Sequence, residues 1–390
     1  MIQSRYEMVR LAKTDKTPIA KAAETFHFKS RSSYYLFARV LREEGFVGLF
    51  DLRPVKGNRG GTRPANVAPL QAVGTPRCRT RPAASVWTPS SGPWRNAFHG
   101  LQHKHRGLFV QIVRALAEGN GVRGTSRIFD VDKNTVLAYL RRAGQQCRRV
   151  TDRLVRGLHV QEAQLDEMWS FVEKKEKHLT EEEYRSGLKG DQWAWGVLDA
   201  CTKVLVQYEI GRRTYRLALD LLRHFRERTD GRPPGLITSD EYPGYPAALL
   251  EVYGVGARGT RKRPPPEMDY AVVSKTRKKG RVVAIDVKVV FGQADRIEKK
   301  LQDSPVSRAV NVAFIERSHL SRRQFNRRLT RRTLGFSKKL RNHLWHYELE
   351  TAVHNFVRPH RALQKRTPMM AAGKTDHPWS VEELLAFTPQ

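Results

Sequence analysis

Cysteine is scarce in this chain of 390 residues, and so are long apolar runs. The three cysteines, Cys78, Cys147 and Cys201, are far apart and form no Cys-x-x-Cys pair. That spacing argues against a structural zinc site or a disulfide framework, and it fits a reducing compartment. No stretch reaches the roughly 20 apolar residues of a membrane-spanning helix. The first residues, MIQSRYEMVR, lack the apolar core of a signal peptide. We therefore expect an intracellular protein with no membrane partner, in the cytoplasm or nucleoid of a prokaryote or the nucleus of a eukaryote.

Basic residues are abundant instead. The chain has 71 Lys and Arg against 39 Asp and Glu, which gives a formal net charge of +32 at pH 7. Such a surplus favours a polyanionic partner, because neutralised phosphates release their counterions. A basic protein of the membrane surface is the weaker alternative, since no long amphipathic basic helix is attached to an anchor. We expect double-stranded DNA as the partner.

A stretch rich in Pro, Gly, Ser, Thr and Arg separates two similar segments. This stretch, residues 56–100, predicts a flexible basic linker. On either side of it, in residues 1–55 and 101–155, two short helical patterns are joined by a tight break. Asp132 is expected to cap the last of these helices and Gly144 to end it.

Two short helices joined by a tight turn, the second rich in basic and polar residues, are typical of a helix-turn-helix. The alternative is a small helical hairpin with a charged outer face. Two such segments in so basic a chain favour two DNA-binding modules. The residues expected to face a DNA groove are Lys29, Arg31, Lys133, Asn134 and Thr135.

From about residue 160 the pattern changes to β-type runs. LDEMWSFV, WAWGVLDA, KVLVQYEIG and GLITSD predict strands, and YRLALDLLRHFRER has helical spacing. Residues 269–292 predict two further strands around a strongly basic turn that includes Lys278, and the C-terminal part reads as helical. The fold class is therefore α/β, a mixed sheet covered by helices.

Three acidic residues stand out by their positions. Asp166 lies within a predicted strand, where side chains alternate faces, so the adjacent Glu167 is expected to point away from it. Asp240 ends another predicted strand, a usual place for a ligand-facing carboxylate. Glu316 is expected near the start of a helix, on one face with Leu320, Arg323 and Arg327.

Carboxylates in such positions suit one kind of phosphate chemistry. Cleavage and strand transfer of DNA need an activated water or 3′-hydroxyl and a stabilised leaving oxygen, and two Mg²⁺ ions about 4 Å apart supply both. Mg²⁺ prefers oxygen ligands, so three acids and a substrate phosphate suffice. Spacing alone does not single out these three among 39 acidic residues.

The runs LDEMWSFV, TSDEYPGY and FIERSHLSRRQFNRRLTRRTLGFSKK together resemble the transposases of the insertion-sequence-one family. The segment HNFVRPHRALQKRTP also resembles a signature that closes the integrase-core domains of related bacterial transposases. The resemblance covers residues from about 105 to 370. It implies an RNase H-like (retroviral integrase superfamily) catalytic core, with the all-α helix-turn-helix modules N-terminal to it.

The resemblance further implies a DDE triad of Asp166, Asp240 and Glu316, holding two Mg²⁺ or Mn²⁺ ions. The interval before Glu316 is longer than the family leads us to expect, so we interpret residues from about 254 to 305 as an insertion. Glu267 and Asp286 are the alternatives to Glu316, which alone lies in the matching helix segment. The expected domains are 1–55, the linker 56–100, 101–155, a core at 156–375 and a tail at 376–390.

We expect a DNA transposase that binds element ends and acts as a homo-oligomer, since two ends must be cut together. Arg323 and Arg327 are the expected phosphate contacts beside the triad. Two alternatives stay open at this point: a DNA-binding regulator that has the fold without catalysis, and an RNase H-like nuclease acting on RNA–DNA hybrids.

Overall fold

The structure is a computed structural model of the chain, and it describes residues 18–25, 34–35, 38, 95–256, 262–278 and 281–389. The chain divides into two compact units, Met1–Trp87 and Thr88–Gln390. In the first unit the described residues include the helix α2 (Ile19–Thr25), which lies where a helix was predicted. Lys29, Arg31 and most of the predicted linker lie outside the described residues.

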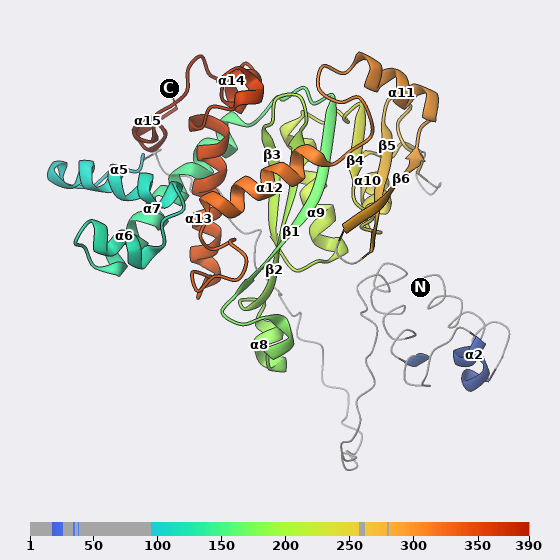
Figure 1. Cartoon of the computed structure of the whole chain (residues 1–390), viewed down its shortest axis with the longest axis horizontal. Coiled ribbons are helices and arrows are strands. Elements are labelled where there is room, and N and C mark those ends of the chain that lie inside the picture. Colours follow the sequence, from blue (N-terminus) through green and yellow to red (C-terminus); the bar gives the residue numbers. More distant parts are fainter. Residues whose placement is uncertain are drawn as a thin grey trace, which may run out of the picture. The chain divides into compact units, whose positions relative to one another are not determined.

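A six-stranded mixed sheet forms the centre of the second unit (Figure 1). Its strand order is β3-β2-β1-β4-β5-β6. The first three strands in the chain pair antiparallel, β1 pairs parallel with β4 and β4 with β5, and β6 closes the sheet antiparallel to β5. The strands are β1 (Glu162–Val172), β2 (Gly190–Asp199), β3 (Leu205–Gly211), β4 (Leu236–Ser239), β5 (Asp269–Lys278) and β6 (Arg281–Phe291).

This mixed α/β architecture confirms the fold class expected from the β-type runs. The predicted hairpin is present as β5 and β6, but β5 is also the parallel neighbour of β4. Part of the segment interpreted as an insertion, residues 254–305, is therefore a strand of the central sheet. The rest of that segment supplies the end strand β6 and the helix α11 (Ala294–Asp303).

Helices cover both faces of the sheet. On one face lie α9 (Tyr215–Arg228) and α10 (Tyr245–Tyr253), where the buried Trp195 ring packs edge-on against the Tyr242 and Tyr245 rings. On the other face, α12 (Ala313–Phe325) crosses β1 and β2, and α13 (Leu340–Ala352) runs beside it (Figure 1). Further helical turns are η1 (Glu176–His178), α8 (Glu181–Ser186), η2 (Val353–Val357), η3 (Arg361–Leu363), α14 (Pro368–Ala371) and α15 (Val381–Ala386).

In the second unit, three helices precede the sheet among the described residues: α5 (His103–Ala117), α6 (Val122–Ile128) and α7 (Lys133–Leu154). The predicted cap of α7 is present, because the Asp132 side chain accepts a hydrogen bond of 2.7 Å from the Asn134 backbone N–H. The expected end at Gly144 is wrong, because α7 continues to Leu154. Gly144 instead lets α7 approach α13 closely, since a Cβ there would lie 2.7 Å from the Trp345 carbonyl oxygen.

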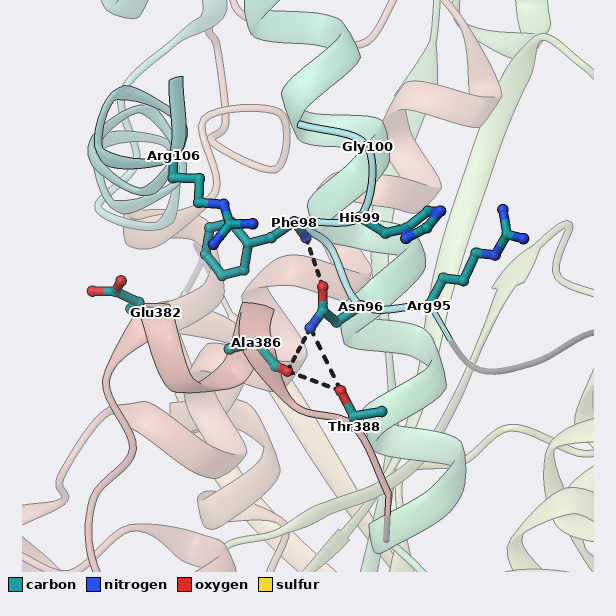
Figure 2. A pocket seen from close by; sticks show the side chains of 9 residues that line it. All are labelled: Arg95, Asn96, Phe98, His99, Gly100, Arg106, Glu382, Ala386 and Thr388. Atoms are coloured by element: carbon teal, nitrogen blue, oxygen red, sulfur yellow. Dashed lines mark hydrogen bonds between the residues drawn. The ribbon is translucent and has the colours of Figure 1, made fainter. Parts of the chain in front are cut away.

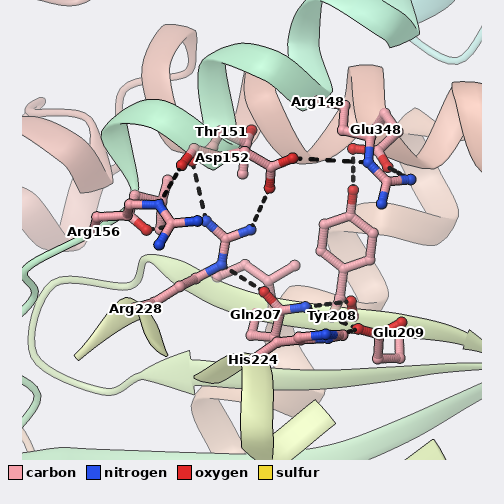
Figure 3. Close-up of polar contacts among 12 residues, drawn as sticks. Arg148, Thr151, Asp152, Arg156, Gln207, Tyr208, Glu209, His224, Arg228 and Glu348 are labelled. Atoms are coloured by element: carbon pink, nitrogen blue, oxygen red, sulfur yellow. Dashed lines mark hydrogen bonds and ion pairs between the residues drawn. The ribbon is translucent and has the colours of Figure 1, made fainter. Parts of the chain in front are cut away.

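Buried polar contacts attach the C-terminal half of α7 to the sheet (Figure 3). The Arg228 guanidinium at the end of α9 donates to the Thr151 carbonyl at 3.1 Å and to the Asp152 carboxylate at 2.8 Å. Its Nε donates to the Gln207 side chain on β3 at 2.5 Å. Residues 101–155 therefore share one compact unit with 156–375, and the helical segment is held against the core.

The last residues of the chain also pack into this unit. Leu384 and Leu385 of α15 are buried, and the Gln146 side chain on α7 donates to the Phe387 carbonyl at 2.8 Å. The segment expected as a tail, 376–390, thus covers α5 and α7, because its leucines complete their core. None of the described helices has the length and apolar character that crossing a membrane requires.

Candidate active site

Asp166 and Asp240, predicted from separate strands, lie side by side in the structure. Leu165 of β1 is opposite Ser239 of β4 in the parallel register, and the two aspartates are the next residues along each strand. Neighbouring strands are about 4.8 Å apart, so this register brings the two carboxyl groups together. Carboxylate oxygens of Asp166, Asp240 and Glu167 all lie within 4.8 Å of one another.

The charge of this cluster is incompletely neutralised. Burial and the neighbouring Asp166 carboxylate raise the pKa of Asp240 to about 6, while the Arg213 guanidinium acts in the opposite direction. Arg213 Nη2 is 3.8 Å from Asp240 Oδ2, which is too far for a hydrogen bond. Two crowded carboxylates with little protein cation between them favour either a proton or a bound cation.

Glu167 lies closer to the aspartates than strand alternation predicts. We expected it to serve a different face from Asp166, yet one of its oxygens belongs to the same cluster. Its side chain does lie on the opposite side of β1, where the Tyr245 hydroxyl donates to Oε1 at 2.5 Å and Arg213 Nη2 to Oε2 at 3.0 Å. Asp240 follows the last residue of β4 that pairs with β1. The carboxylates of Glu167 and Asp240 can therefore approach each other past the end of that pairing.

Each carboxylate oxygen of Glu167 thus has its own hydrogen-bond donor. Burial and the Asp240 charge raise the pKa of Glu167 to about 8, and Arg213 and Tyr245 act against that rise. With these contacts, Glu167 holds Arg213 beside Asp240. The sequence carried no signal for this role, because Arg213 and Tyr245 come from distant segments.

A histidine that the sequence reasoning missed approaches Asp166 from the other face. His319 is buried on α12, and its Nδ1 lies 3.3 Å from Asp166 Oδ2. The second Asp166 oxygen, Oδ1, accepts the Glu167 backbone N–H at 2.8 Å. The available signal was helical spacing, since His319 follows Glu316 by three residues and so shares its helix face.

Glu316 lies on α12 as predicted, but its carboxylate is not part of the three-residue cluster. The side chain is 44% exposed, and Lys275 Nζ on β5 donates to its Oε1 at 2.7 Å. Lys275 is thus paired with an acid. The two alternatives lie farther from the aspartates in the sheet: Glu267 precedes β5 at the opposite end from Asp240, and Asp286 is on the end strand β6.

The arginines that follow Glu316 divide into two groups. Arg322 and Arg328 are buried: Arg322 pairs with Glu350 of α13, and Arg328 donates to His346 at 3.2 Å. Arg323 is half-buried, and partial burial and the neighbouring Arg331 lower its pKa, while Asp166 acts to raise it.

The other predicted DNA contacts are on the surface. Arg327 is exposed, and it lies just beyond α12, which ends at Phe325. The prediction that Arg327 shares a helix face with Glu316 is therefore wrong. Lys278 is exposed at the end of β5. Lys133 and Asn134 are exposed and Thr135 half-buried in the first turn of α7.

The chemistry of the cluster fits a hard divalent cation. Its donors are carboxylate oxygens, the ligands that Mg²⁺ and Mn²⁺ prefer. Burial and the Asp166 carboxylate raise the pKa of Asp240, and a cation bound between the aspartates would offset the repulsion between them. Asp166 and Asp240 could therefore hold a metal, with Glu167 within reach and Glu316 on the adjacent helix.

A hollow lies elsewhere, beside α5 and α15 (Figure 2). It has a volume of about 490 Å³, and Asn96 on its wall donates to the Ala386 carbonyl at 3.0 Å. Its lining contains none of the clustered acids, so it is not the candidate active site. The residues that line it are Arg95, Asn96, Phe98, His99, Gly100, Arg106, Glu382, Ala386 and Thr388.

No protein-family model matches the chain, and no curated protein sequence does. Among solved structures, the chain is similar to one described as the crystal structure of the Mos1 strand transfer complex, at 14% identity and a TM-score of 0.14. That similarity covers 64% of this chain and 73% of the other. A second, described as the Mos1 transposase paired-end complex with left transposon end, shows 12% identity and a TM-score of 0.15 over 63% and 74% of the two chains. TM-scores this low do not establish a common fold.

Proposed function

We propose that this protein is a DDE-type DNA transposase, with Asp166, Asp240 and Glu316 as its metal-binding triad. The observation that carries the proposal is the convergence of Asp166 and Asp240 from the centre of one strand and the end of its parallel neighbour. The helix that bears Glu316 crosses the strand that bears Asp166, and its His319 contacts that aspartate.

The strand order supports an RNase H-like core. Three antiparallel strands followed by two parallel ones, in the order β3-β2-β1-β4-β5, form the sheet expected of that core, and β6 extends it. In such a core the first strand carries one acid, the fourth ends in another and a helix on the face supplies the third. Asp166 lies on β1, Asp240 directly follows β4 and Glu316 lies on α12, which supports their assignment to these three roles.

Two bound Mg²⁺ or Mn²⁺ ions would activate a water or a 3′-hydroxyl and stabilise the leaving oxygen. The side chains of the protein have separate tasks. Glu167 and Tyr245 orient Arg213 beside Asp240, and Lys275 neutralises Glu316. Arg323 and Arg327 would contact phosphates near the cleaved bond.

The helices α6 and α7 would form the DNA-reading module that is described in the structure, with Lys133, Asn134 and Thr135 at the start of α7. These three residues lie at the opposite end of α7 from Thr151 and Asp152, which contact Arg228. A homo-oligomer on DNA would bring two ends together. The formal charge of +32 supports binding to element ends and to target DNA.

The test uses duplexes made from the DNA that flanks the gene. Wild-type protein should nick them in Mg²⁺ and join the freed 3′-ends to target DNA. Asp166→Asn, Asp240→Asn and Glu316→Gln should each reduce cleavage by about 10³-fold or more. Each variant should bind the same duplex in EDTA as tightly as wild type, measured by fluorescence anisotropy.

A matched control is Glu298→Gln, which changes an acid on α11 and should cleave normally. Wild-type protein that binds these duplexes but never cleaves would favour a regulator without catalysis. Cleavage of RNA–DNA hybrids in preference to the duplexes would favour an RNase H-like nuclease. Full cleavage by Glu316→Gln with loss in Asp166→Asn would remove Glu316 from the triad.

A further inference from the structure

Within the part of the chain that the structure describes, the end strand β6 forms one edge of the sheet. It spans Arg281–Phe291, and among the described strands it pairs with β5 alone (Figure 1). Most of its side chains are exposed. An edge strand presents a row of unpaired N–H and C=O groups that can pair with another strand, and proteins usually blunt such edges with charges, prolines or bulges.

One face of β6 is apolar in the part of the strand that pairs regularly with β5. Ile285 and Val287 lie on the same face because strand side chains alternate, and they are 61% and 49% exposed. Val283, which is 52% exposed, lies at an irregularity of the β5–β6 pairing. This face continues into a hollow of about 440 Å³ against α11. Its apolar lining consists of Val287, Val289, Ala294, Ile297, Leu301 and Val310. A continuous apolar surface of this kind marks an interaction site.

The charges of β6 are complementary to those of a second, antiparallel β6. Asp286 and Lys288 lie on the other face of the strand, one on each side of Val287. If two copies pair about a two-fold axis at Val287, Asp286 of each copy lies opposite Lys288 of the other. The same register places Ile285 opposite Val289, so that the apolar faces also match. Opposite charges directly across an antiparallel pair stabilise it, and like charges destabilise it.

We propose that β6 is a dimer interface, at which two copies of this chain join their sheets antiparallel with Val287 at the two-fold axis. A two-fold interface requires a surface that is complementary to itself, and β6 meets that requirement in both charge and apolar pattern. Within the described residues, neither Asp286 nor Lys288 has an ion-pair partner in its own chain. The interface does not depend on the proposed activity and forms without DNA.

The test exchanges the two charges. Asp286→Lys alone places two lysines opposite each other on both sides of the two-fold axis. Lys288→Asp alone places two aspartates opposite each other at the same positions. Each single variant should dimerise about tenfold more weakly than wild type or worse, measured by sedimentation velocity over a dilution series in EDTA. The double variant D286K/K288D restores complementary charges and should dimerise like wild type.

Mixing the two single variants provides the sharpest measurement. Both charge pairs across the interface are then complementary, so the mixture should form heterodimers more tightly than either variant forms homodimers. Circular dichroism and thermal melting should show that all variants fold, because both side chains are exposed on β6. A monomeric wild type, single variants that dimerise normally, or a double variant and mixture that stay monomeric would each overturn the proposal.

Discussion

Replacing Asp166 by Asn should stabilise the metal-free protein, even though it removes a residue proposed to be essential for activity. Asp166 and Asp240 repel each other across β1 and β4, and Asn keeps the shape and the oxygen that accepts the Glu167 N–H. The same substitution should abolish the stabilisation that Mg²⁺ gives to wild type. Opposite effects in EDTA and in Mg²⁺ would distinguish a metal site from a merely structural pair.

The size of the effect follows from the pKa of Asp240. A rise from 3.8 to about 6 corresponds to about 3 kcal/mol when the carboxylate is ionised. The side chain is 37% exposed, so solvent screening reduces this to about 1.5 kcal/mol. Burial contributes more than Asp166 does, which leaves about 0.5 kcal/mol for the repulsion that Asn removes. For a unit of this size the melting temperature should rise by about 1–2 °C.

The pH dependence has a defined sign. The folded-state pKa of Asp240 is raised, so ionising this carboxylate destabilises the fold. This destabilisation is absent below pH 3.8, grows as the pH rises to about 6 and is complete above that. The advantage of Asp166→Asn should therefore be present at neutral pH and disappear near pH 4. A control, Asp230→Asn, changes an exposed aspartate away from the cluster and should show neither effect.

Differential scanning fluorimetry in EDTA and in Mg²⁺ measures both effects. If about 10 mM Mg²⁺ binds with a Kd of about 1 mM, wild type should gain about 1.4 kcal/mol. Equal stabilisation of wild type and Asp166→Asn by Mg²⁺ would refute the metal site. A lower melting temperature for the variant in EDTA would refute the repulsion argument.

Three further predictions concern the fold. Gly144→Ala should lower the free energy of unfolding by about 1–3 kcal/mol, because its Cβ would overlap the backbone of α13. Gly107→Ala, in open space on α5, should instead gain about 0.5–1 kcal/mol, and urea denaturation compares the two. Arg322→Met should cost about 3–5 kcal/mol by leaving Glu350 buried and unpaired, whereas replacing both partners by apolar residues should cost far less. Burial lowers the pKa of His346 to about 3, so stability should fall as the pH drops below about 6.5. His346→Gln should remove about 2 kcal/mol of the loss between pH 6.5 and pH 5, and an unchanged pH profile would contradict a buried neutral imidazole.

Local features of this protein were readable from the residue pattern. The strands that carry Asp166 and Asp240, the hairpin of β5 and β6 and the capping aspartate Asp132 all follow from periodicity and from residue type at element ends. These features depend on neighbours within a few residues, and backbone geometry restricts such neighbours to a few arrangements. The positions of the two aspartates, one within a strand and one just after a strand end, were therefore predictable.

Contacts between distant segments depended on the tertiary structure. The sequence pattern predicted that Gly144 ends a helix. In the structure Gly144 lies within α7, where the absence of a side chain allows α13 to approach closely. Arg322 and Arg323 are adjacent in an arginine-rich helix, yet only packing buries one against Glu350 and leaves the other near Asp166. His319 at the aspartates could likewise be recognised only from the folded chain. Periodicity identifies which face of an element is buried, whereas the partner it meets is decided by how helices and strands pack together.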